Sequence, residues 1–115
     1  HRSHSKHLDV KFMSGGIADI EFIVQYLVLA FAHGYPSLLK ARSTTMLLSM
    51  LAELHLLPED TTQTLLSIYA QYEIFLRRHI LQAQNHDERN QFEKERAIVQ
   101  SIGEHIFQST SAVGE

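Results

Sequence analysis

Two acidic residues one position apart, Asp19 and Glu21, form the pair with the most obvious chemical potential, because an otherwise apolar stretch surrounds them. Enzymes that transfer phosphoryl or nucleotidyl groups hold metal ions with pairs of carboxylates, and on a strand residues i and i+2 share a face. On a helix the same residues point about 200° apart and cannot hold one Mg²⁺ together. The sequence favours a helix here, so the pair alone predicts no metal site.

A pair of glycines, Gly15 and Gly16, precedes the acidic residues. Free amide groups at the start of a helix attract anions, so the pair could receive a phosphate. Adjacent glycines also let a chain pass closely beneath a packed helix. In that interpretation Asp19 complements the helix dipole or caps the amide groups at Gly16. The residues leave both interpretations open.

Two further groups could bind ligands. His1, His4 and His7 recur every third residue and could hold zinc or nickel on one helical face, although a solvated polar leader is the favoured interpretation. Arg77, Arg78 and His79 form a small basic cluster; a solvated face is the favoured interpretation, and contact with a phosphate or carboxylate is the alternative. The sequence contains no Ser/His/Asp set, no phosphate-binding GxxxxGK[ST] loop and no HExxH motif.

The composition limits the function classes. A chain of 115 residues with 44% hydrophobic content is sufficient for one domain. A net charge of -3 gives no overall attraction to nucleic acid or to anionic lipid, so neither is an expected partner. The absence of cysteine excludes disulfides and thiolate chemistry and is compatible with the cytoplasm, the expected location.

The element that must position the acidic pair is a helix over about 17–33, which ends at Gly34 with Pro36 beyond. Its apolar residues point in nearly every direction, so we expect neighbours to surround it at the centre of the fold. A membrane span is not favoured, because the run is shorter than the roughly 20 residues required and carries Asp19, Glu21 and Gln25.

Three more helices and an arm complete the predicted all-α bundle. Ser43 or Thr44 caps a helix over 43–55, Pro58 opens one over 59–84, and a weaker apolar stripe follows over 87–108. The tyrosines and phenylalanines of the third helix are interpreted as core. Residues 1–13, with the alternating LDVKFM, form an extended arm, 14–108 the bundle, and 109–115 a frayed tail.

The stretch LDVKFMSGGIADIEFIVQYLVL closely resembles the D-x-K-x-x-x-GG-x-x-DIEF-x-x-Q-Y block of glutamine synthetase adenylyltransferases, bacterial enzymes that attach AMP to glutamine synthetase and remove it. Lys11, Gly15, Gly16, Asp19 and Glu21 are all in place. The resemblance covers about residues 8–107. The chain departs from the pattern at Tyr72-Glu73, where a Leu-Arg pair is usual, and at Ser43-Thr44-Thr45, where Ser-Asp-Asn is usual.

The resemblance implies a helical domain that follows a nucleotidyltransferase domain. QYLVL and FEKERAIVQSIGEHIF look more like the second, AMP-adding half of the family's enzymes. The family uses ATP and Mg²⁺ to transfer AMP to a tyrosine of glutamine synthetase, under control by a PII signalling protein and glutamine. Its metal-binding Asp-x-Asp lies in the preceding domain and is absent here, so we expect no catalytic residue, no cofactor and no activity in this piece alone.

Our hypothesis is that Lys11, Gly15, Gly16, Asp19 and Glu21 face the nucleotidyltransferase domain and orient the nucleotide or the loops of the metal site, because polar groups at one end of an otherwise apolar helix need a polar neighbour. One alternative is a module that docks glutamine synthetase or PII protein through the third and fourth helices. Another is the similar helical domain of a PII uridylyltransferase. A free-standing helical adaptor is the least specific alternative.

Overall fold

Helices make up nearly all of the part of the chain that this computed structural model describes, residues 15–81 and 92–114. They are α2 (Ile17–Phe31), the short 3₁₀ helix η1 (Pro36–Lys40), α3 (Thr44–Glu53), α4 (Glu59–Leu81) and α6 (Glu93–Gly114). The predicted all-α class is confirmed. The arm at 1–13, with Lys11 and the three histidines, lies outside the described residues.

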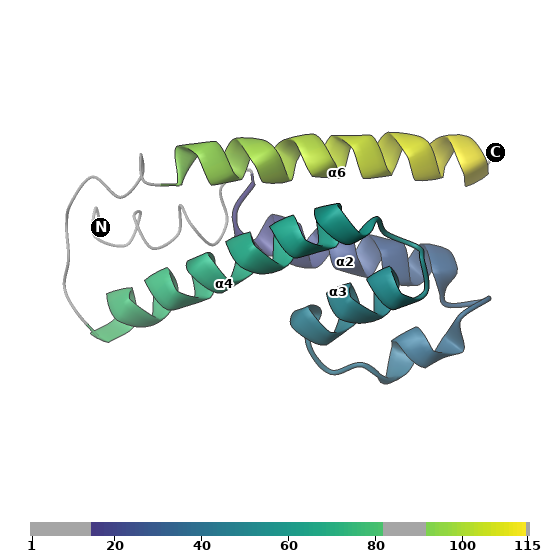
Figure 1. The fold of residues 1–115 in the computed structure, drawn as a ribbon, viewed down its shortest axis with the longest axis horizontal. Helices are drawn as coiled ribbons and strands as arrows, with labels where there is room; N and C mark the ends of the chain where they lie inside the picture. The colour runs from purple at the N-terminus through teal and green to yellow at the C-terminus, as the bar shows by residue number, and fades with distance from the viewer. Residues whose placement is uncertain (1–14, 82–91, 115) are drawn as a thin grey trace.

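Helix α2 is the central element. It contacts α3, α4, α6 and η1, with α6 along one side and α3 and α4 on the other (Figure 1). Ile20 and Val24 of α2 are completely buried, as are Leu48 of α3 and Leu65 of α4. The central position was predicted correctly. The expectation that neighbours surround the helix is wrong for one face, since Phe22 and Leu29 are 60% and 82% exposed.

Local signals set the boundaries of α3 and α4. The Ser43 hydroxyl accepts a hydrogen bond from the Met46 amide at 3.0 Å, as expected for an N-cap. The end of α3 is a Schellman turn: His55 has a φ of 61°, and the Leu56 amide donates to the Leu51 carbonyl at 2.9 Å. Helix α4 begins directly after Pro58, as predicted.

Other predicted boundaries need correction. The first helix ends at Phe31 rather than 33, and the segment after Pro36 is a 3₁₀ helix whose Leu38 is buried. The last helix, α6, begins at Glu93, directly after Phe92, whose ring packs against Tyr72 and Phe75; the predicted start at 87 lies outside the described residues. It continues to Gly114, so the predicted tail from 109 is helical, since neither proline nor glycine interrupts 109–113.

No helix within the described ranges combines the length and the apolar character that crossing a membrane requires.

Candidate functional site

The start of α2 is fixed by contacts to Gly15 from three sides. The Gly15 amide donates to Oδ2 of Asp19 at 2.6 Å, and the Tyr72 hydroxyl of α4 donates to the Gly15 carbonyl at 2.8 Å. The backbone of Arg96 in α6 occupies the space that a Cβ on Gly15 would need. We call these four residues the Gly15 junction. It joins α2, α4 and α6 at one point.

Only glycine satisfies the junction. Gly15 has a φ of +83°, in the region that side chains with a Cβ rarely adopt. A Cβ added there would overlap the Arg96 carbonyl oxygen and lie 2.7 Å from the Arg96 Cα. The interpretation that glycine lets the chain pass beneath a packed helix is therefore confirmed at Gly15. Its amide already binds a carboxylate, so it is not a site for an external anion.

Asp19 and Glu21 have different partners within the domain. Asp19 caps the amide of Gly15, one residue earlier than the amide group at Gly16 that we predicted. Glu21 is exposed, and its Oε2 accepts a hydrogen bond at 2.8 Å from the hydroxyl of Tyr69 in α4. Asp19 therefore holds the segment directly before α2, whereas Glu21 connects the first turns of α2 to α4.

The two tyrosines remain hydrogen-bond donors over a wide pH range. Burial, assisted by the neighbouring Glu21 carboxylate and opposed by a hydrogen bond with Thr44, raises the pKa of Tyr69 from 10.0 to about 12. Burial also raises the pKa of Tyr72 well above its usual value, against the opposing effect of Arg96. Both phenols are neutral near pH 7, which suits a hydroxyl that donates to a carboxylate or a carbonyl.

The junction is suited to positioning rather than to acid–base chemistry. Within residues 15–81 and 92–114, no group of three or more His, Asp or Glu side chains is arranged to hold a metal ion. The ATP-bound Mg²⁺ that the resemblance implies therefore has no suitable set of ligands in this part of the chain. What the junction provides is a fixed direction for the first turns of α2.

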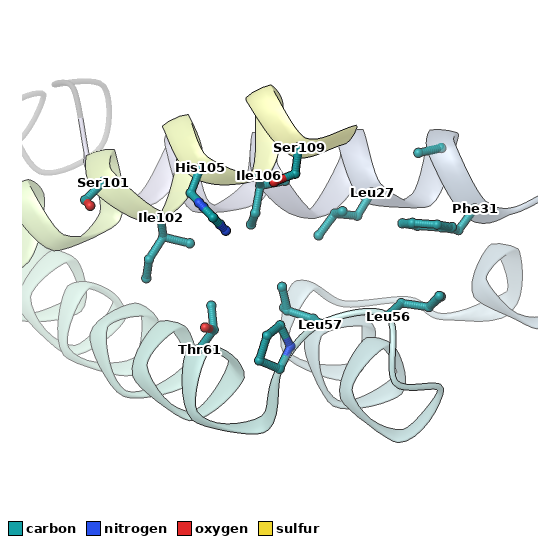
Figure 2. A pocket seen from close by; sticks show the side chains of 12 residues that line it. Leu27, Phe31, Leu56, Leu57, Thr61, Ser101, Ile102, His105, Ile106 and Ser109 are labelled. Carbon is teal, nitrogen blue, oxygen red and sulfur yellow. The ribbon is translucent and has the colours of Figure 1, made fainter. Parts of the chain in front are cut away.

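An apolar cleft of about 780 Å³ opens between α6 and the connection from α3 to α4. Figure 2 shows Ile102, His105 and Ile106 of α6 across the cleft from Leu57 and Thr61. Leu27 and Phe31 of α2 also line it, and both the His105 ring and the Thr61 hydroxyl are polar groups at its wall. Sequence reasoning did not find the cleft, because its apolar residues follow the same helical spacing as ordinary core.

The family model described as GlnD PII-uridylyltransferase matches residues 1–114, nearly the whole chain. The chain belongs to this family.

Two relatives of this chain carry the same name, "bifunctional glutamine synthetase adenylyltransferase/adenylyl-removing enzyme". That of Nitrosococcus oceani is 40% identical over an alignment of 114 residues, and the alignment covers 96% of this chain and 12% of the relative. That of Idiomarina loihiensis is 37% identical over 105 residues, 91% of this chain and 11% of the relative. The GlnD-family chain thus spans about an eighth of the relatives' length. The resemblance stated from the sequence is confirmed, and no solved structure is significantly similar.

The predicted site residues of this GlnD-family chain are partly brought together. Gly15, Gly16 and Asp19 lie together where α2 begins, whereas Glu21 lies on another side of the helix and Lys11 is outside the described residues. Sequence reasoning missed the roles of Tyr69 and Tyr72, which it assigned to the core. A signal existed, because a tyrosine inside an apolar stripe carries a hydroxyl that needs a partner when buried.

Proposed function

We propose that this chain is the helical domain beside a nucleotidyltransferase domain in a glutamine synthetase adenylyltransferase. The observation that carries the proposal is the 40% identity over 96% of the chain to an enzyme of that name. The whole enzyme transfers AMP from ATP, with Mg²⁺, to a tyrosine of glutamine synthetase in the cytoplasm, under control by a PII protein. By the resemblance of its QYLVL block and its last helix, the domain belongs to the AMP-adding half.

In this proposal the domain holds the nucleotidyltransferase domain in position and does not itself supply catalytic groups. Asp19 and Glu21 bind different partners, Gly15 and Tyr69, and neither carboxylate forms part of a metal-binding cluster with other described residues. The nucleotidyltransferase domain supplies the metal-binding carboxylates. This chain alone is therefore inactive.

The proposed interface to the nucleotidyltransferase domain is formed by Lys11, Asp19 and Glu21, which orient the nucleotide or the loops of the metal site. Gly15 and Gly16, first placed in the same interface, are buried and act by holding the start of α2. Two observations support this interface. Glu21 is exposed, so its carboxylate is accessible to a neighbouring domain. The Gly15 junction also fixes the direction of α2, so a domain that contacts its first turns is held in one orientation.

The variants Asp19→Asn and Glu21→Gln in the whole enzyme separate this role from a structural one. Each amide keeps an oxygen that accepts the bond from Gly15 or Tyr69 but loses the charge. We expect AMP transfer to glutamine synthetase to fall about tenfold or more, equivalent to 1.4 kcal/mol in the barrier, with little change in melting temperature.

The matched control is Glu53→Gln, which neutralises an exposed acid at the end of α3. It should change neither transfer nor melting temperature. If the Asp19 and Glu21 variants lose stability and transfer in proportion, the two acids act only in folding.

The family model supports a second candidate, the helical domain of a PII uridylyltransferase. The two enzymes differ in donor and acceptor, so the whole enzyme should be assayed with ATP and glutamine synthetase, and separately with UTP and PII protein. Transfer of UMP to PII without transfer of AMP would favour this candidate. The remaining alternative is that the domain only docks glutamine synthetase or PII protein through α4 and α6. Titrating the isolated domain against each of these proteins tests it, and binding to either would favour it.

A further inference from the structure

One face of α2 is apolar and exposed. Ile20, Val24 and Leu27 face the core and are at most 2% exposed, whereas Phe22 is 60% and Leu29 82% exposed. Phe22 and Leu29 are two helical turns apart and lie on the same side of α2. A helix that is apolar on all sides is usually covered on all sides. The domain by itself leaves this side of α2 uncovered.

A ring from α6 extends the apolar face. The Phe107 ring lies 5.8 Å from that of Phe22 and 4.8 Å from that of Tyr26, both in edge-to-face geometry. Tyr26 and Phe107 are half-buried, so their remaining area is continuous with the exposed Phe22. We call Phe22, Tyr26, Leu29 and Phe107 the α2–α6 surface.

Acidic groups border this surface. A hollow of about 400 Å³ between α2 and α6 is lined by Asp19, Phe22, Gly103, Glu104 and Phe107, among others. The sequence of α2 contains no Lys, Arg or His. A complementary partner therefore presents an apolar side chain flanked by Lys or Arg.

We propose that the α2–α6 surface is covered by the nucleotidyltransferase domain of the same polypeptide, which inserts an apolar side chain flanked by basic residues beside Phe22. This inference rests on the proposed function. The matched region is 12% of the Nitrosococcus oceani relative, so the other 88% of that polypeptide lies outside it. Asp19 belongs both to the hollow and to the proposed interface, which makes the two contacts one continuous surface.

A photoreactive benzophenone amino acid in place of Leu29, in the whole enzyme, identifies the occupant. Irradiation followed by peptide mass spectrometry should yield cross-links to the nucleotidyltransferase domain. The control is the same amino acid in place of Leu39 of η1, which is 67% exposed on a different element and should yield no such cross-link. Cross-links to residues 1–14, to a second copy or to glutamine synthetase, or none above the control, overturn the proposal.

A charge at the surface gives a second, independent measurement. Leu29→Glu in the whole enzyme should reduce AMP transfer about tenfold or more, whereas Leu39→Glu should leave it unchanged. Because Leu29 is 82% exposed, the 115-residue chain carrying Leu29→Glu should melt as the parent chain does, which excludes misfolding.

The two proposals fail in different ways. An enzyme that transfers AMP but shows no cross-link from position 29 to the nucleotidyltransferase domain refutes only the covered surface. An enzyme that transfers no AMP refutes the proposed function, whatever the cross-links show.

Discussion

Replacing Tyr72 with phenylalanine removes one oxygen from the Gly15 junction and little else. The Tyr72 side chain is completely buried, its hydroxyl donates to the Gly15 carbonyl at 2.8 Å, and its ring lies edge-to-face on Phe92 at 5.1 Å. Phenylalanine keeps the ring contacts but leaves a buried carbonyl without its donor. An unsatisfied buried acceptor costs about 1–3 kcal/mol, so we expect the free energy of unfolding to fall by about 2 kcal/mol.

Urea unfolding of the 115-residue chain, followed by circular dichroism, measures this loss as a lower midpoint at an unchanged m value. The control is Tyr35→Phe, since Tyr35 is 38% exposed and its change should stay within about 0.5 kcal/mol. A loss for Tyr72→Phe no larger than the control's would refute the assigned hydrogen bond as a source of stability.

Three further predictions concern the same fold. Gly15→Ala should lower the unfolding free energy by about 3 kcal/mol or more, because it combines a φ of +83° with an overlap on the Arg96 backbone; thermal melts measure this. His55→Gly should raise the free energy of unfolding, measured by urea titration, by about 1 kcal/mol, because His55 has a φ of 61° and glycine adopts a positive φ without steric cost. At alkaline pH, the stability that Tyr69 contributes is complete below pH 10 and is lost as the pH rises through about 12, since only the unfolded chain releases the proton in that range. Urea titrations at a series of pH values measure this. Between pH 10 and 12 the unfolding free energy of the Tyr69→Phe variant should fall less steeply than that of the parent chain, by about 1.4 kcal/mol per pH unit.

The helices could be predicted from the sequence because their signals are local. The apolar period, the Ser43 cap and Pro58 act within one or two turns, and all three determine helix positions in the structure. The errors occur where tertiary contacts decide. Phe92, directly before the last helix, packs its ring against Tyr72 and Phe75, which are distant in sequence, so no local pattern indicates this contact.

The candidate site was only partly predictable for the same reason. Gly15 and Asp19 are four residues apart, so a cap by Asp19 near the start of the helix was predictable, although it falls on the Gly15 amide rather than on Gly16. Tyr72 lies 57 residues from Gly15, and Arg96 reaches it from a third helix. No local pattern indicates that these residues meet. The cleft beside His105 likewise depends on how α6 lies relative to the α3–α4 connection, which helical spacing does not determine.

The four residues Asp-Ile-Glu-Phe illustrate what the structure adds to the resemblance. Asp19 accepts a hydrogen bond from the Gly15 amide, Ile20 is completely buried, and Glu21 accepts one from the Tyr69 hydroxyl, so each of the three has a contact within the domain. Phe22 differs, because it is 60% exposed and touches the domain through the edge of Phe107. Phe22 is therefore the residue of this block at which the proposed contact with the nucleotidyltransferase domain should be sought.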